Sequence, residues 1–567
     1  MDSALPTLHC DVLVIGSGAA GLSTAVAAAL FGLKIIVVEK EQQFGGTTAW
    51  SGGWMWIPRN PLAIAAGINE PLNEARKYLQ SELGDYFNAK LIDTYLELAP
   101  EMVKFFAENT AVQFIDGNSI PDLHGFSVGA STGGRIIGVA AFDGTELGKH
   151  LQFLKPPLKE TTIFGMGVTS GFDANHFYTA KKSWQSFKYV AARLARHFAS
   201  RVQHGRGTHL VGGNALVARL AVSALKLGVD IRVSHPVETL TTKDGRVTGA
   251  SVISGGGSFQ IEAGSAVVLA TGGFAHDNNR KRELLPHTHT GEAHWSAAPR
   301  GNTGDGLTMA EGLGAEVIAE RSAAALAPIS LVPRGDGTYT HFPHIHERGK
   351  AGLIAVNRAG KRFTNEANSC FDFMSDLLDS GLTESWLICD HRFIRRWGLG
   401  AVKPSPMPFQ IESFVHNGYL LRAKSIRALA ESAVIDPNGL VEAVERYNSQ
   451  AMTGVDDDFH KGETPHDKMQ GNQEHKPNPC MAPILTAPFY AMKLLPGSLG
   501  TFAGLHTNEF SQVLRQDDKA IAGLYATGSD MASVMAGHYP SVGIALGPAM
   551  TFGYIAAKHI AESDSVV

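Results

Sequence analysis

Short apolar runs that end in glycine recur along this chain, a pattern typical of buried parallel strands that turn into helices. Near the N-terminus, the apolar residues 12–15 are followed by Gly16-Ser17-Gly18-Ala19-Ala20-Gly21 and by an alanine-rich stretch without proline to about Phe31. A second apolar run, 35–38, ends at Glu39. The pattern predicts a dinucleotide-binding unit in which a helix N-terminus faces the pyrophosphate and the acid binds a ribose.

The same pattern, an apolar run followed by glycine, recurs farther along the chain. Residues 266–270 form an apolar run that ends in Thr271-Gly272-Gly273, and residues 521–526 lead to a glycine turn at Gly528. Residues 243–247 predict a hairpin turn between two strands. Helical patterns lie at 21–31, 91–106, 186–198 and 214–227. The sequence therefore predicts a dinucleotide fold that is split by insertions.

A glycine and hydroxyl cluster at 45–53, Gly-Gly-Thr-Thr-Ala-Trp-Ser-Gly-Gly, follows the strand that carries the acid. Small residues let a ligand approach the backbone, and hydroxyl groups can bond phosphate oxygens. Together with residues 11–21, this cluster resembles the FAD-binding pattern of the fumarate reductase and succinate dehydrogenase flavoprotein superfamily. The resemblance extends through 270–273, 302–306, 357–366 and the C-terminal segment, and it implies FAD as the cofactor.

The runs and the resemblance together predict an α/β fold with a Rossmann-type FAD-binding domain, split in sequence, and an inserted α+β substrate or capping domain. We expect the first part of the FAD-binding domain at 1–275, with a helical insertion at about 54–200. Many prolines and histidines mark the substrate domain, expected at 276–492. The C-terminal part of the FAD-binding domain is then expected at 493–567.

The residues expected to contact FAD lie at the glycine turns, in the hydroxyl cluster and at the strand ends. They are Gly16, Ser17, Gly18, Ala19, Ala20, Gly21, Glu39, Lys40, Gly45, Gly46, Thr47, Thr48, Ser51, Gly52, Gly53, Val237, Ala270, Thr271, Gly272, Asn302, Asp305, Gly528, Asp530, Ala545 and Leu546. The cluster at 45–53 contains no histidine, so we expect non-covalent FAD.

The most discriminating segment is 537–557. Tyr539 and Pro540 precede a glycine-marked helix start, where a tyrosine hydroxyl and a free N–H group could converge on one carbonyl oxygen. An isolated Tyr-Pro pair is more often a packed tyrosine beside a helix cap. The segment resembles the C-terminal motif of 3-ketosteroid dehydrogenases, which implies that Tyr539 and Gly543 form an oxyanion hole.

The reaction implied by this resemblance is α,β-desaturation of a ketone. A base removes the α-proton, hydrogen-bond donors stabilise the enolate, and flavin N5 accepts hydride from the β carbon. The tyrosines that supply the base in ketosteroid enzymes are missing here, after Pro121-Asp122 and after Asn365-Glu366. These departures favour a small hydrophobic ketone of the cyclohexanone type over a steroid. The remaining candidates for the base are Tyr178, Tyr339 and His124.

Other functions stay open at this point. Fumarate reductases place an arginine where this chain has Tyr539-Pro540-Ser541, which disfavours reduction of a dicarboxylate. Reverse reaction as an enone reductase, or a Δ4 regiochemistry in which Ser541 assists Tyr539, is compatible with the motif. A flavin-holding electron-transfer subunit is the non-enzymatic alternative.

Composition narrows the classes of partner. The formal charge of −5 and the dispersed basic residues argue against nucleic acid. No leader pattern or membrane-spanning run is visible, and four scattered cysteines suit a reducing cytoplasm. A metal site at His341, His344 and His346 is disfavoured because further ligands at suitable spacing are lacking. No second dinucleotide fingerprint is visible, so we expect an external, quinone-like electron acceptor.

Overall fold

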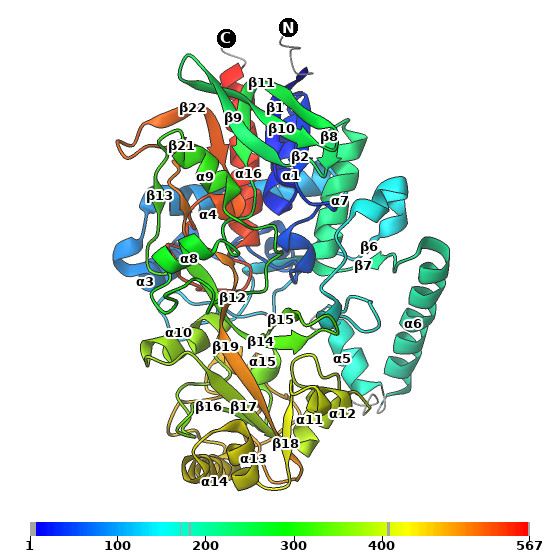
Figure 1. Cartoon of the computed structure of the whole chain (residues 1–567), viewed down its shortest axis with the longest axis vertical. Helices are drawn as coiled ribbons and strands as arrows, with labels where there is room; N and C mark the ends of the chain where they lie inside the picture. Colours follow the sequence, from blue (N-terminus) through cyan, green and yellow to red (C-terminus); the bar gives the residue numbers. More distant parts are fainter. Residues whose placement is uncertain (1–6, 170–171, 181–182, 405–408, 565–567) are drawn as a thin grey trace.

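The computed structural model describes residues 7–169, 172–180, 183–404 and 409–564. Part of the N-terminal stretch used above to argue against a leader, residues 1–6, lies outside this range. The chain builds two large sheets, of eight and seven strands, with helices packed around them (Figure 1). The arrangement of the strands in these sheets decides which of the predicted glycine turns lie next to each other.

The eight-stranded sheet has the order β21-β22-β11-β1-β2-β8, with β10 and β9 attached to β11. β1 is parallel to both of its neighbours, and β11 is parallel to β22, so the carboxyl ends of these strands share one edge. Its strands are β1 (Thr7–Ile15), β2 (Ile35–Glu39), β8 (Asp230–Val233), β9 (Val237–Lys243), β10 (Arg246–Ser254), β11 (Gly257–Leu269), β21 (Gln512–Leu514) and β22 (Ala520–Ala526). The predicted strands at 12–15, 35–38, 266–270 and 521–526 are confirmed.

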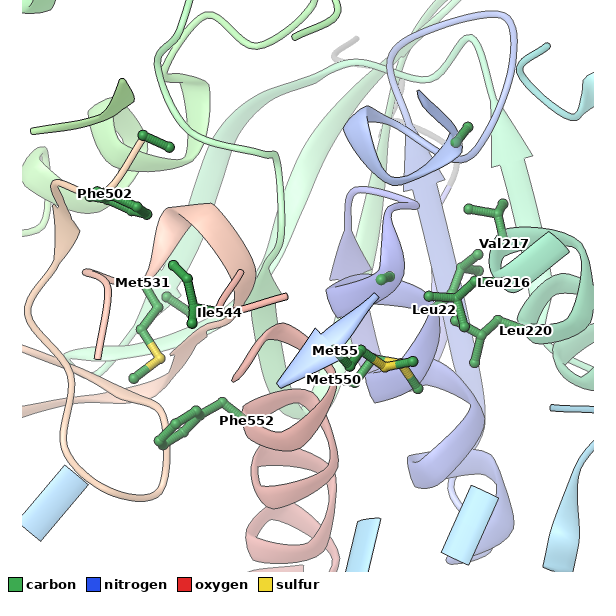
Figure 2. Packing of buried hydrophobic residues seen from close by; sticks show 14 of the residues in the cluster. Leu22, Met55, Leu216, Val217, Leu220, Phe502, Met531, Ile544, Met550 and Phe552 are labelled. Carbon is green, nitrogen blue, oxygen red and sulfur yellow. The ribbon is translucent and has the colours of Figure 1, made fainter. Parts of the chain in front are cut away.

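Helix α1 (Ala19–Leu30) packs between α7 (Gly212–Lys226) and α16 (Leu546–Asp564), as Figure 1 shows. Nearly every position of α1 is buried, which explains why its sequence is apolar all round and not amphipathic. Leu22 packs toward Leu216 and Leu220 of α7 (Figure 2). The C-terminal helix therefore belongs to the same layer as the first helix.

The predicted hairpin turn is confirmed at Asp244-Gly245, between β9 and β10. Both residues have positive φ, 52° and 77°, as a two-residue turn of the favoured hand requires. The next strand, β11, runs antiparallel to β10 and then continues between β1 and β22 to Leu269.

The insertion at 54–200 is mainly helical, as expected, but also holds the small sheet β3-β5-β4. The predicted helices at 91–106 and 186–198 are confirmed as parts of α4 and α6. The elements between β2 and β8, apart from α7, are β3 (Met55–Trp56), α2 (Pro61–Ala65), α3 (Leu72–Leu83), α4 (Ala89–Asn109), β4 (Phe114–Asp116), β5 (Ile136–Val139), β6 (Phe142–Asp143), α5 (Phe172–Thr179), α6 (Trp184–His204) and β7 (His209–Leu210).

The seven-stranded sheet has the order β15-β14-β19-β17-β16, with β12 and β18 also paired to β19. Strand β19 (Phe489–Thr501) continues past residue 492, where the sequence predicted the return to the FAD-binding domain. From Thr501 the chain reaches β20 (Gly504–Leu505) and then β21 of the first sheet. β19 thus leads the chain from the second sheet back toward the first.

The remaining elements form the second sheet together with β19, surround it or lead into it. They are α8 (Asn278–Leu284), β12 (Trp295–Ser296), α9 (Asp305–Glu311), β13 (Val317–Ile318), β14 (Ala324–Pro333), β15 (Tyr339–Pro343), β16 (Leu353–Val356), α10 (Cys370–Asp379), β17 (Ser385–Asp390), α11 (His391–Trp397), α12 (Phe409–His416), β18 (Leu421–Ala423), α13 (Ile426–Ala433), α14 (Pro437–Thr453) and α15 (Pro465–Gln470).

A buried ion cluster ties the second sheet to the segment after α14. Arg362 donates to both Glu366 oxygens at 2.9 Å and to the two Asp456 oxygens at 2.9 and 2.8 Å. Lys461 lies 3.1 Å from the Glu366 carboxylate and donates to Leu353 O at 2.8 Å. Two cations and two carboxylates balance each other away from water.

Replacement of Arg362 by methionine is expected to lower the free energy of unfolding by about 3–5 kcal/mol, because two buried carboxylates would share one cation. Urea unfolding followed by tryptophan fluorescence measures this loss. Arg446→Met, which removes an exposed partner of Asp458, is the matched control and should change little. Equal urea midpoints for the two variants would contradict the assignment of the cluster as a stability determinant.

Candidate active site

The first glycine turn brings β1 and β11 into backbone contact. Gly16 has φ 110°, and a Cβ atom there would lie 2.1 Å from Ala270 O. A Cβ on Gly21 would lie 2.0 Å from Gly16 O. Both positions therefore require glycine, and Ala270 and Gly16 lie side by side as the sequence predicted.

A second glycine loop lies next to the first. A Cβ built on Gly46 would lie 3.8 Å from Gly18 Cα, and one on Gly18 would lie 3.6 Å from Thr48 Oγ1. Gly18 is the N-cap of α1 and offers no side-chain hydrogen bond to the helix. The first N–H group of α1, on Ala19, donates to Thr48 Oγ1 at 3.0 Å. The other N–H groups of its first turn and the bare glycine backbones nearby suit a pyrophosphate.

Glu39 closes β2 beside these glycine loops. Its carboxylate accepts hydrogen bonds from Ser17 N at 3.3 Å, Ser17 Oγ at 2.5 Å and Glu41 N at 3.0 Å. Burial raises the pKa of Glu39, and the Ser17 hydroxyl counteracts that rise. The acid is held at the strand end, where a ribose hydroxyl would have to bind.

The turn after β11 is fixed by Asp530 of the turn after β22. The Asp530 carboxylate accepts hydrogen bonds from Thr271 N at 2.5 Å, Thr271 Oγ1 at 2.9 Å and Gly273 N at 2.9 Å. Asn302 donates to Thr47 Oγ1 at 3.0 Å and to Gly272 O at 2.7 Å. The two hydroxyl and glycine clusters predicted from sequence are thereby joined into one site.

The other predicted FAD contacts border the same site. Lys40 pairs with Asp305 at 2.5 Å, and a Cβ on Gly53 would lie 2.5 Å from Gly212 C. Val237 starts β9, two residues after His235, whose N–H donates to Glu39 O at 2.8 Å. The remaining members are Ala19, Ala20, Gly45, Ser51, Gly52, Gly528, Ala545 and Leu546, which lie in the glycine loops, at the start of α1 or at the start of α16.

A pocket continues from these turns toward β19. Thr501, Phe502, Gly528, Met531, Ile544 and Ala545 are among the residues that line it. Figure 2 shows Phe502, Met531 and Ile544 close together in this part of the core. The Thr501 hydroxyl is buried and has no hydrogen-bond partner within the described chain. An apolar wall with an unused hydroxyl fits a flavin ring, whose edges carry hydrogen-bonding groups.

The Tyr539–Gly543 loop is anchored through its backbone. Pro540 O accepts hydrogen bonds from the Tyr78 hydroxyl at 2.5 Å and from Leu123 N at 3.2 Å. Gly543 has φ 92°, and a Cβ there would lie 2.6 Å from Met55 Cα. Gly543 O accepts from Trp56 N at 3.2 Å. The loop therefore needs both this glycine and the insertion around Trp56 and Tyr78.

The Tyr539 ring is held between two aromatic rings. It stacks on Phe371 with centroids 6.1 Å apart and tilts against Phe502 at 6.1 Å. Desolvation raises the pKa of Tyr539 above its ordinary value, with a further rise from Cys370. Among the described residues, neither the Tyr539 hydroxyl nor the Gly543 N–H has a hydrogen-bond partner. Two neutral donors thus remain available, next to the pocket residues Phe502 and Ile544.

The three candidates for the base lie in different surroundings. His124 Nε2 lies 2.9 Å from Asp372, and Nδ1 bonds Glu82, so both ring nitrogens are occupied by carboxylates. Tyr339 is about half exposed at the start of β15. Tyr178 of α5 packs edge-on against Trp397 at 5.2 Å, and burial together with Glu347 raises its pKa.

Glu347 is a mostly buried charged group that adds to the effect of burial in raising the pKa of both Tyr178 and Cys370. Although burial disfavours its charge, His344 at 2.6 Å lowers the pKa of Glu347 to about 2. Cys370 adjoins both Glu347 and Tyr539, and Arg348 Nη2 donates to Cys370 Sγ at 3.4 Å. Sequence reasoning missed Phe371, Phe502 and Glu347, because only the fold brings α10 and β19 to the Tyr539 loop.

The histidine-rich segment is used for structure in the described chain. His344 Nε2 bonds Ser330 Oγ at 2.7 Å, and His341 Nδ1 bonds Ser296 O at 2.6 Å. Across the described residues, no group of three or more His, Cys, Asp or Glu side chains is arranged to hold a metal ion. In the same range, no helix is both long and apolar enough to cross a bilayer.

The chain is similar to known flavoproteins over almost its whole length. The sequence family described as FAD binding domain matches residues 11–546. The 4-oxocyclohex-2-ene-1-carboxylate 5-dehydrogenase of Sinomonas cyclohexanicum is 38% identical over 565 residues, which cover 99% of this chain and 95% of the relative. The 3-oxosteroid 1-dehydrogenase of Mycolicibacterium smegmatis is 34% identical, with 98% and 97% covered.

A solved structure shares the fold in detail. The crystal structure of 3-ketosteroid delta1-dehydrogenase from Sterolibacterium denitrificans, in complex with 1,4-androstadiene-3,17-dione, superimposes with a TM-score of 0.90 at 34% identity. The match covers 98% of this chain and 100% of that chain.

The contacts of His124 predict a specific pH dependence of stability. Burial disfavours the imidazolium, but hydrogen bonds to Asp372 and Glu82 outweigh burial and raise the pKa of His124 to about 10. Because the pKa of His124 is higher in the folded state, its protonation stabilises the fold. This stabilisation is complete at a pH below the unfolded pKa of about 6.5, and it is lost as the pH rises toward 10.

We expect His124→Gln to lower the melting temperature most at pH 6 and progressively less up to about pH 10, in differential scanning fluorimetry. The control is His460→Gln, since His460 is an exposed partner of Glu463 at 3.1 Å. A difference between wild type and His124→Gln that stays constant over this range would contradict a charged His124.

Proposed function

The chain belongs to the FAD-binding flavoprotein family and is an FAD-dependent dehydrogenase, and on that premise we propose that it desaturates a cyclic ketone between the α and β carbons. The observation that carries the proposal is the pair of unused donors, the Tyr539 hydroxyl and the Gly543 N–H, beside the flavin pocket. When bound, FAD supplies the hydride acceptor. We expect it to be held non-covalently, because residues 45–53 contain no histidine.

Tyr539 and Gly543 form the oxyanion hole in this proposal. Removal of an α-proton places negative charge on the carbonyl oxygen, and two donors aimed at that oxygen lower the barrier. The raised pKa of Tyr539 keeps its hydroxyl protonated, as a donor must be. The anchors on Pro540 O and Gly543 O hold the donors in place without using either of them.

We keep Tyr178 as the base. His124 is occupied on both nitrogens, and Tyr339 stands at an exposed strand end. Tyr178 is 44% exposed, and partial burial of its hydroxyl together with Glu347 raises its pKa. To take the α-proton, the phenol must first lose its own proton, which its exposure to solvent allows. Ser541, whose buried hydroxyl has no hydrogen-bond partner within the described chain, would assist Tyr539 if the reaction had Δ4 regiochemistry.

The substrate is proposed to be an oxo-cyclohexane or oxo-cyclohexene ring compound, as the name of the relative at 38% identity suggests, with 3-ketosteroids as the second class. The rings of Phe371 and Phe502 make the surroundings of Tyr539 apolar, which supports a hydrophobic alicyclic substrate. An external quinone-like compound is the proposed electron acceptor.

The test is anaerobic bleaching of the flavin absorbance by saturated cyclic ketones, 3-ketosteroids and succinate. We expect a ketone to bleach the wild-type flavin. In Tyr539→Phe the rate should fall about 100-fold or more, the usual cost of one oxyanion-hole donor. Gly543→Ala should lose activity as well, because its Cβ would clash with Met55.

Tyr86→Phe is the control, since it also removes one tyrosine hydroxyl but from a residue that is 47% exposed. Bleaching by succinate alone would replace ketone desaturation with dicarboxylate chemistry. An unchanged rate in Tyr539→Phe would remove Tyr539 from the oxyanion hole.

A further inference from the structure

Helix α6 (Trp184–His204) has its polarity inverted relative to a normal surface helix. Trp184, Phe187, Phe198 and Val202 are 68%, 51%, 47% and 87% exposed. With the exposed Ala191 and Ala195, they recur at intervals of three and four residues, so they form one continuous stripe. We call these six residues the α6 stripe.

The opposite face of α6 is polar and is turned toward the protein. Buried Arg193 pairs with Asp173 of α5 at 3.2 Å, and buried His197 Nε2 bonds Phe164 O at 3.0 Å. Ser200 Oγ lies 3.0 Å from Thr208 Oγ1. Specific polar contacts therefore hold the helix in the orientation that exposes the α6 stripe, which excludes a simple rotation of the helix as a way to bury it.

Aromatic contacts join residues within the α6 stripe and add Phe164 to its exposed apolar surface. Trp184 and Phe187 stack with centroids 5.3 Å apart, and Phe198 packs 6.1 Å from Phe164, which is 50% exposed. Figure 1 shows α6 at the margin of the molecule, beside α5 and away from the strands of both large sheets. An exposed apolar surface of this kind marks a contact with something outside the chain.

The charge of α6 indicates what that contact is. The helix contains four basic residues and no acidic residue, although the whole chain has a net charge of −5. Lys188 and Arg201 are exposed and flank the α6 stripe on opposite sides. Aromatic residues on one face with lysine and arginine at its borders are typical of a helix that lies in the headgroup layer of an anionic membrane.

We propose that α6 docks this protein onto the surface of an anionic lipid bilayer. The α6 stripe enters the boundary between headgroups and acyl chains, and Lys188 and Arg201 contact lipid phosphates. The Lys188 ammonium lies 5.4 Å from the Trp184 ring, so a charged residue and an apolar residue of this surface are in contact. A bilayer accepts the whole length of the helix, whereas a protein partner of matching charge would need acidic groups along both borders of an apolar groove.

The test is co-sedimentation of the FAD-loaded full chain with vesicles of phosphatidylcholine containing phosphatidylglycerol, and with vesicles of phosphatidylcholine alone. We expect binding to the anionic vesicles that weakens with salt. Lys188→Gln combined with Arg201→Gln should reduce the partition coefficient about tenfold or more. Trp184→Ser with Phe187→Ser should also reduce it. Phe126→Ser, at a 76% exposed phenylalanine outside α6, is the control and should bind as wild type.

Bromine-labelled lipids add a readout specific to the helix, since they should quench Trp184 fluorescence in wild type and lose that component in Trp184→Phe. All variants are compared by flavin content and by turnover of a soluble ketone, so that misfolding is recognised. No binding to anionic vesicles, or equal binding by the charge variant, would overturn the proposal. A dimer in analytical ultracentrifugation that the stripe variant dissolves would assign the face to a second copy instead.

Discussion

The site depends on the close approach of β1 and β11 at their carboxyl ends. At Gly16 a side chain would collide with Ala270 O at 2.1 Å, so the two turns touch through backbone alone. Because β1, β2, β11 and β22 are parallel, their following turns all reach the same edge of the sheet. One constraint, the backbone contact between these two turns, explains the glycine at position 16 and places the N-terminus of α1 at this edge, as in a dinucleotide-binding fold.

Strand β19 belongs to the second sheet and ends next to these turns. It pairs with β14 and β17 and ends at Thr501, which lines the pocket beside the glycine turns together with Phe502. Phe502 and Phe371 then hold the Tyr539 ring, while Tyr78 and Leu123 from the insertion hold Pro540 O. Three separate parts of the chain are therefore needed to position two hydrogen-bond donors.

Features with local causes could be predicted from the sequence. Glycine turns after apolar runs, the Asp244-Gly245 hairpin and the helix at 91–106 depend on neighbouring residues, and each is present. The course of β19 beyond 492 could not be predicted, because an apolar run does not reveal which sheet receives it. His124 between Glu82 and Asp372 depends on contacts between distant segments. The pattern at 186–198 predicted a helix, but its apolar stripe would ordinarily be assigned to the core, and the inward polar contacts reverse it.

The central claim is that a cyclic ketone loses hydride from its β carbon to the flavin while Tyr539 and Gly543 stabilise the carbonyl oxygen. The most direct measurement is the rate of anaerobic flavin reduction in a stopped-flow instrument, with one ketone substrate unlabelled or deuterated at the β carbon. The account predicts slower bleaching with the deuterated compound and one equivalent of enone formed per flavin reduced. Bleaching without enone formation would contradict it.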